Sequence, residues 1–432
     1  MTRDFAVRSR SSRHVAVSHR TVTSGAVTIM GMGALRLYLC LVTVLVAGTL
    51  AAAQTTLDAP GVRQPPQLKV PRIAALPEAQ WTDVHRQLVD KFAGGKPDTA
   101  FLTLLNLPAL VEGVMPYTNY LAGESSLVPR HCELLILRTA WLLGNQPLWA
   151  KHAARARQAG LAAADIRRIA QGPDAQGWSS FDATLLRTVD QLYRNSSITD
   201  ATWKALAAEY DMFHLMDAVE TVNQFTILAM AYNSFGVQPD PGTTDRLPTD
   251  VPYRVTVPAR EPALTVARVP EPAGRGIAVS RSFGQYPRLS QPWSVRQNFI
   301  QRVSKLSPRH REMLILRIGW NCRSEYEWAQ HVGAVGRARD YGLDPVRIAE
   351  GPAATGWDSF EKVLLQVPDE LYRDGIVSDA TWRVLAEQFD PTLMMTAVFT
   401  AGGYRAISMS LNSYGIQLEP TTTERFPNVP GR

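Results

Sequence analysis

The sequence predicts an all-α protein made of two tandem copies of one helical domain. Pairs of identical residues recur at a constant spacing of 179 positions, which is typical of an internal repeat. Segments that begin with Ser, Thr or Asp continue with apolar residues at helical spacing, and no convincing strand-like alternation appears. The 179-residue spacing holds for Pro108 and Pro287, Glu133 and Glu312, Gly177 and Gly356, and Asn233 and Asn412.

Proline-rich segments separate the predicted domains. They span residues 60–71 and 239–262, and proline-rich sequence is typical of linkers. The first copy is therefore placed at residues 69–248 and the second at 255–428. A chain of 432 residues with 45% apolar composition is long enough to give each copy its own core.

The two copies differ in two places. From His152 to Gly160 the chain advances 8 positions, whereas from His331 to Gly342 it advances 11. The first copy also contains an amphipathic stretch from Pro77 to Phe92, which the second copy replaces with Pro- and Gly-rich sequence. We therefore expect the second copy to lack an N-terminal helix.

The N-terminus, residues 1–53, is predicted to be a leader with a signal peptide. It holds six arginines and one aspartate, so it carries +5 of the net charge of +6. The nearly neutral remainder gives no indication of a nucleic-acid partner. An apolar run starts at Leu37, and small residues up to Ala53 suit a signal peptidase. We expect cleavage near Ala53, a secreted or periplasmic protein, and membrane contact only through the signal; a membrane anchor and an organelle transit peptide are the alternatives.

Two cysteines, Cys132 and Cys322, follow the predicted cleavage site. They do not occupy matching positions in the two copies. Either they form one disulfide in an oxidising compartment, or they stay as two unpaired buried thiols.

Each copy carries a glutamate, an arginine and a histidine at fixed separations. Glu133 and Arg138 begin an apolar helix in the first copy, and His152 follows on the next helix. In the second copy Glu312, Arg317 and His331 repeat this order, and both Glu-to-His separations are 19 residues.

The segment Tyr326-Glu-Trp-Ala-Gln-His331 and the stretch from Thr400 to Gly415 resemble the carboxymuconolactone decarboxylase family, which includes the alkylhydroperoxidase D group. The resemblance covers both copies and implies an all-α fold without a metal or organic cofactor. The family's peroxidase branch has a Cys-x-x-Cys pair seven and four residues before the histidine. Ser324 and Glu327 stand at these positions here, and Asn145 and Leu148 in the first copy, so a hydroperoxide reductase is the disfavoured alternative.

The second copy resembles the decarboxylase branch, which has a carboxylate four residues before the histidine. Glu327 and His331 lie on one face of a helix, and Glu312 is able to approach them. We predict a cofactor-free lyase or isomerase for a small carboxylated or lactone metabolite, with His331 as general base and acid. Glu312 and Glu327 would orient His331, and Tyr326 would donate a hydrogen bond to the substrate. The predicted substrate-binding residues are Arg317, Arg405, Trp328 and Tyr404. In the first copy, the equivalents of Glu312, Arg317 and His331 are Glu133, Arg138 and His152.

Purely structural roles compete with this hypothesis. Ser324 and Glu327 match a capping box, and Asn145 suits an N-cap. His152 lacks a carboxylate at Leu148, which favours a structural histidine. The tryptophans Trp141, Trp178, Trp320 and Trp357 are interpreted as core. A non-catalytic binding or assembly module is therefore the second hypothesis; in either case we expect a homo-oligomer, and the sequence has no zinc-type His/Cys cluster.

Overall fold

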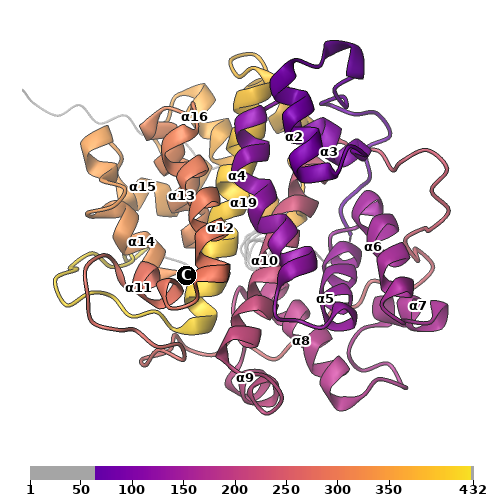
Figure 1. Cartoon of the computed structure of the whole chain (residues 1–432). Coiled ribbons are helices and arrows are strands. Elements are labelled where there is room, and N and C mark those ends of the chain that lie inside the picture. Colours follow the sequence, from indigo (N-terminus) through magenta and orange to yellow (C-terminus); the bar gives the residue numbers. More distant parts are fainter. Residues whose placement is uncertain (1–63, 430–432) are drawn as a thin grey trace, which may run out of the picture. The chain divides into compact units, whose positions relative to one another are not determined.

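Every regular element between residues 64 and 429, the part that this computed structural model describes, is helical (Figure 1). The predicted all-α fold is thus confirmed. The predicted signal peptide falls on residues 1–53, outside the described residues, so secretion stays a prediction. Among the described residues, no helix combines the length and apolar character that crossing a membrane requires.

Most helices of the N-terminal half (residues 69–248) recur at equivalent positions in the C-terminal half (residues 255–428). The N-terminal half contains η1 (Glu78–Gln80), α2 (Asp83–Ala93), α3 (Thr99–Leu104), α4 (Pro108–Asn119), η2 (Tyr120–Glu124), α5 (Pro129–Leu142), α6 (Gln146–Gln158), α7 (Ala163–Gln171), α8 (Ser180–Asn195), α9 (Asp200–Ala207) and α10 (Met212–Phe235). The C-terminal half contains α11 (Ala278–Gly284), α12 (Pro287–Asn298), η3 (Phe299–Val303), α13 (Pro308–Asn321), α14 (Glu325–Val332), η4 (Ala338–Tyr341), α15 (Pro345–Glu350), η5 (Gly351–Ala353), α16 (Ser359–Leu364), α17 (Gln366–Asp374), α18 (Asp379–Leu385) and α19 (Pro391–Tyr414). The bounds of α4 and α12, of α5 and α13, and of their η2 and η3 turns differ by 179 residues. The domain boundaries themselves stay a prediction.

The two sequence differences between the halves correspond to structural ones. No helix forms between the end of α10 and the start of α11, so α2 has no counterpart, as expected from the Pro- and Gly-rich sequence. Helix α6 starts at an N-cap formed by Asn145, whose Oδ1 accepts a hydrogen bond from the backbone N–H of Leu148 at 2.9 Å. This N-cap was predicted. Helix α14 is shorter than its counterpart α6. The extra residues that the C-terminal half has between His331 and Gly342 form a turn and η4.

Two long helices, α10 and α19, form the centre of the fold. Asp211 caps the start of α10 and Asp390 caps the start of α19. Figure 1 shows α5–α8 and α13–α16 on opposite sides of the group formed by α4, α10, α12 and α19. Every residue of α10 from Leu215 to its end is buried, because this helix packs along α19 and against α5. A Cβ atom on Gly402 would lie 3.2 Å from Met230, so the glycine permits this close packing.

Two arginines connect the halves in a reciprocal way. Arg72 donates to the carbonyls of Ser234 in its own half and Val377 in the other, and pairs with Asp379. Arg268 makes the equivalent contacts with Ser413, Ile198 and Asp200, each of which lies 179 positions from its counterpart. The N-terminal segment of each half therefore binds the other half.

A third arginine, Arg405 on α19, bridges equivalent positions of the two halves. Its guanidinium is fully buried and donates to the carbonyls of Leu371 (2.8 Å), Tyr372 (3.2 Å) and Tyr193 (3.0 Å). Tyr193 and Tyr372 lie 179 residues apart, at the C-terminal ends of α8 and α17. A cation at two helix C-terminal ends is favourable, because both ends present carbonyls with partial negative charge.

We predict that Arg405→Met destabilises the protein by about 3 kcal/mol or more, because three carbonyls would lose their donor. Urea denaturation measures the change. The control is Arg373→Met, because Arg373 pairs with Asp374 at the surface and such pairs contribute about 0–1 kcal/mol. Equal losses in the two variants would contradict the bridging role of Arg405.

Candidate functional site

In the C-terminal half, His331 lies between two carboxylates. Its Nδ1 is 2.6 Å from Oε2 of Glu312, and its Nε2 is 2.9 Å from Oε1 of Glu327. Helix α13 supplies Glu312, while α14 supplies Glu327 and His331 one helical turn apart. All three side chains are buried. The structure thus brings together the three residues predicted to form the acid–base group.

The charge of His331 differs from what a general base requires. Burial lowers the pKa of His331, but the negative charges of Glu312 and Glu327 outweigh burial and raise it to about 10. At neutral pH the ring is therefore an imidazolium, and each N–H donates to a carboxylate. His331 has no free lone pair, so the predicted role of general base does not fit; Glu327 is the better candidate.

Glu327 is not a capping residue. Ser324 makes no side-chain cap hydrogen bond, and its buried hydroxyl has no partner among the described residues. The capping-box interpretation is therefore wrong, because Glu327 pairs with His331 instead of returning to the start of its helix. Oε2 of Glu327 has no hydrogen-bond partner in residues 64–429, and the side chain lines a cavity.

This cavity, here called the His331 cavity, has a volume of about 290 Å³. The polar residues that line it include Gln297, Gln301, Arg302, Glu327, His331 and Tyr404. Tyr404 stands edge-on to His331, with ring centroids 4.9 Å apart. Its hydroxyl accepts a hydrogen bond from Gln301 at 3.0 Å. Burial and the carboxylates of Glu327 and Glu312 raise the pKa of Tyr404, so its hydroxyl keeps a proton that it can donate.

Two polar residues of this cavity lack partners within the described part of the chain. Arg302 is exposed and its guanidinium makes no ion pair or hydrogen bond there, and Gln297 is buried with its Oε1 unbonded. Neither was singled out from the sequence. A comparison of the two copies could have pointed to both, because the residues 179 positions earlier differ in chemistry. Gly123 corresponds to Arg302, and Thr118 corresponds to Gln297.

Two further residues, Arg311 and Gly336, lie against Glu312. Nε of Arg311 donates to its Oε1 at 3.3 Å, and Nη1 of Arg311 donates to the carbonyl of Gln301 at 3.0 Å. The turn after α14 brings Gly336 so close that a Cβ there would overlap Oε2 of Glu312 and the carbonyl of His331. The longer segment after His331 thus covers the Glu312–His331 pair.

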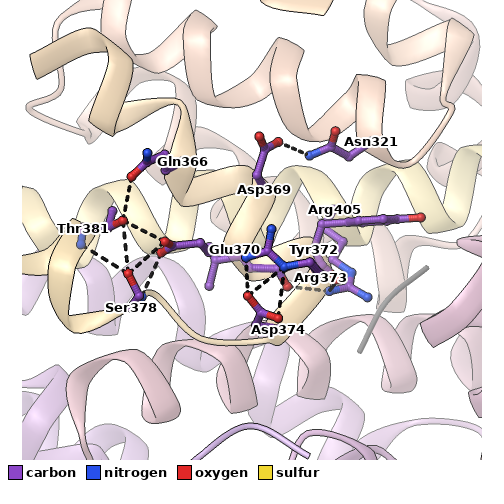
Figure 2. Close-up of polar contacts among 11 residues, drawn as sticks. Asn321, Gln366, Asp369, Glu370, Tyr372, Arg373, Asp374, Ser378, Thr381 and Arg405 are labelled. Carbon is purple, nitrogen blue, oxygen red and sulfur yellow. Dashed lines mark hydrogen bonds and ion pairs between the residues drawn. The ribbon is translucent and has the colours of Figure 1, made fainter. Parts of the chain in front are cut away.

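Three predicted substrate-binding residues lie elsewhere. Arg317 is bound to Asp369 through two hydrogen bonds (2.6 and 3.0 Å) and to two carbonyls near the C-terminal end of α15, so its guanidinium is fully used. Figure 2 shows Arg405 at the carbonyl of Tyr372 on α17, where it bridges the halves. Trp328 packs on Trp320 in a separate apolar cluster. None of the three lines the His331 cavity, whereas Tyr404 does.

Tyr326 lies at the edge of the His331 cavity, but its proton is used within the protein. The hydroxyl donates to Oε1 of Glu419 at 3.0 Å and accepts from the backbone N–H of Val279 at 3.4 Å. Its hydroxyl proton is therefore not available to a substrate as predicted, whereas Tyr404 lines the cavity.

The N-terminal half contains a related but differently charged pair. Nδ1 of His152 donates to Oε2 of Glu133 at 2.7 Å, and Arg155 donates to Oε1 at 3.0 Å. Leu148 stands where Glu327 stands in the C-terminal half. Burial lowers the pKa of His152 below its usual value, and Glu133 alone does not offset this effect. Arg138 repeats the structural role of Arg317 through its pair with Asp190.

The thiols are unpaired and unsuited to redox chemistry. Cys132 and Cys322 are both free and buried, which is the second alternative given above. Burial raises the pKa of each thiol, so the reactive thiolate is scarce. No group of His, Cys, Asp and Glu within residues 64–429 is arranged to hold a metal ion.

The tryptophans mostly follow the prediction. Trp141, Trp320 and Trp357 are buried, as core residues should be. Trp178 is only partly buried, and its indole N–H donates to the carbonyl of Gly172.

The fold and the two Glu–His pairs define an all-helical protein with acid–base groups buried between its helices. Residues 108–187 match the model of the carboxymuconolactone decarboxylase family. The matched segment runs from α4 into α8 and supports that family for the N-terminal half. That the C-terminal half is a second copy stays a prediction. Searches of the curated proteins and of the solved structures found no match.

The raised pKa of His331 leads to a prediction about stability and pH. A histidine whose pKa rises from about 6.5 to about 10 on folding contributes full stability below pH about 6.5 and loses it as the pH approaches about 10. In Glu327→Gln one carboxylate is lost, so this decline with pH should become smaller. Urea denaturation at several pH values between about 6 and about 10 measures it. Glu350→Gln, the same change at an exposed residue, is the control; a Glu327→Gln profile parallel to the wild type would contradict the pairing.

Gly336→Ala is predicted to destabilise the protein by about 1–3 kcal/mol, because the new methyl group overlaps the Glu312 carboxylate. The measurement is the free energy of unfolding. Gly284→Ala is the matched control, since no atom lies within 4 Å of the added Cβ. A loss of similar size in both variants would show that close packing on Glu312 is not the cause.

Proposed function

We propose that this protein is a cofactor-free acid–base enzyme, a lyase or isomerase that acts on a small carboxylated or lactone metabolite in the His331 cavity. One observation carries the proposal: a buried carboxylate, Glu327, is fixed by an imidazolium and lines a cavity with one oxygen unbonded. Such a group is a positioned general base.

In the proposed reaction, Glu327 takes a proton from a carbon next to a carbonyl group of the substrate. The C–H bond breaks, the proton passes to Oε2, and the electron pair moves into the carbonyl to form an enolate. Tyr404 donates its hydroxyl proton in a hydrogen bond to the enolate oxygen. Where a C=C bond of the substrate is conjugated with this enolate, the electron pair extends to the γ carbon, and return of the proton from Glu327 to that carbon shifts the double bond and completes an isomerisation.

The same groups support decarboxylation. The bond to a carboxylate in the position β to the carbonyl breaks, CO₂ leaves, and the electron pair again forms an enolate. Glu327, protonated from solvent before this step, then gives its proton to the carbon. Both reactions need one group that transfers a proton to or from a substrate carbon and a second group that donates a hydrogen bond to the enolate oxygen. Glu327 and Tyr404 supply these two functions.

We assign the binding of the substrate carboxylate to Arg302. Its guanidinium lines the cavity and has no carboxylate partner among the described residues. Arginine binds carboxylates through paired hydrogen bonds, which would fix the reacting carbon relative to Glu327. Arg302 thus replaces Arg317 and Arg405 in this role.

The test is a panel of small oxo acids and lactone carboxylates, followed by NMR for C–H exchange in D₂O and for CO₂ release. For a substrate that turns over, Glu327→Gln should lower kcat by about 100-fold or more. Arg302→Met should mainly raise KM, because the carboxylate is bound equally in the ground and transition states. Glu350→Gln, an exposed carboxylate outside this cavity, is the control.

Unchanged turnover in Glu327→Gln would refute the assignment. Binding of these acids without any turnover by the wild type would favour the binding-module alternative. Peroxide reduction that depends on Cys132 or Cys322 would favour the hydroperoxide reductase instead.

A further inference from the structure

A second cavity, here called the His152 cavity, lies in the N-terminal half and has a volume of about 270 Å³. Phe101 and Phe225 contribute to its apolar walls, and His152, Lys96, Lys151 and Arg155 contribute polar groups. Phe92 and Ala93 come from α2, the helix that the C-terminal half lacks. This cavity is therefore built in part from a segment without a counterpart in the other half.

His152 presents a hydrogen-bond acceptor at this cavity. Its Nδ1 carries the proton, because the atom that it contacts is a carboxylate oxygen of Glu133, which only accepts. Its Nε2 has no hydrogen-bond partner within residues 64–429, and the ring lines the cavity. Phe225 packs edge-on against the ring at 5.0 Å and holds it in place.

The cations around the His152 cavity are not equivalent. Lys151 pairs with Asp98 at 2.6 Å, and Arg155 pairs with Glu133 at 3.0 Å. Lys96 is exposed, and its ammonium group makes no ion pair or hydrogen bond within the described part of the chain. Lys96 is thus the cation that is available to an anionic ligand.

We propose that the His152 cavity is a separate binding site for a small aromatic carboxylate that bears a hydroxyl group. Lys96 binds the carboxylate, the apolar walls contact the ring, and Nε2 of His152 accepts a hydrogen bond from the hydroxyl. The proposal does not depend on catalysis in the His331 cavity. It changes the interpretation of His152 from a structural histidine to a ligand contact.

The two cavities should select different ligands, because corresponding positions carry different chemistry. Glu327, Tyr404 and Arg302 of the His331 cavity correspond to Leu148, Phe225 and Gly123. At these corresponding positions the His152 cavity offers apolar side chains beside a neutral acceptor, whereas the other cavity offers a carboxylate and a phenol.

The probe is 4-hydroxybenzoate, titrated into the full chain by isothermal titration calorimetry, with benzoate as the analogue that lacks the hydroxyl. We expect 4-hydroxybenzoate to bind several-fold more tightly than benzoate, and Lys96→Met to weaken its binding by about tenfold. Lys91→Met is the matched control, because Lys91 lies on α2, is exposed and does not line the cavity. Glu327→Gln reports on the other cavity and should leave this binding unchanged.

Absence of 4-hydroxybenzoate binding, or equal loss in Lys96→Met and Lys91→Met, would overturn the proposal. Loss of binding in Glu327→Gln alone would place the ligand in the His331 cavity instead. Equal affinity for benzoate and 4-hydroxybenzoate would remove His152 from the binding site.

Discussion

The packing of α10 along α19 is the constraint on which both candidate sites depend. Phe225 on α10 touches His152, and Tyr404 on α19 touches His331. The central helices therefore form one wall of each cavity and hold each imidazole ring against its glutamate. A shift between α10 and α19 would move both rings, and the arginines Arg72, Arg268 and Arg405 oppose such a shift because each bonds to both halves.

One position contributes most of the difference in protonation between the two histidines, and the cations Lys151 and Arg155 beside His152 act in the same direction. Both histidines are buried and both pair with a glutamate 19 residues earlier. Where the residue four positions before the histidine is Leu148, desolvation prevails and the ring stays neutral. Where it is Glu327, the second negative charge outweighs desolvation and the ring is charged. The same framework thus provides a neutral acceptor in one half and a fixed carboxylate in the other.

Much of this arrangement was predictable from local signals, and the errors have physical causes. The Glu–His pairs follow from a repeated spacing, and the Asn145 cap from short-range chemistry. Arg317 and Arg405 were assigned to the substrate because arginine binds carboxylates through paired hydrogen bonds, but the sequence does not say which partner each arginine finds. Their partners, Asp369 and three helix-end carbonyls, come from distant segments that only the fold brings near. Likewise, His331 is charged because Glu312 and Glu327 contact its two ring nitrogens at the same time, and the spacing of these residues in the sequence does not show that both contacts form.

A single covalent chain permits an asymmetry that a symmetric dimer does not. If the halves are copies, Arg405 corresponds to Thr226, so one arginine serves the carbonyls of both Tyr193 and Tyr372. Two identical domains would bring two arginines to that place, where their charges would repel in a buried environment. When the two halves belong to one chain, corresponding interface positions can carry different residues, so a single arginine can occupy that place. It equally allows Glu327 in one half without a second carboxylate at Leu148 in the other, so the two cavities can differ while the shared core stays intact.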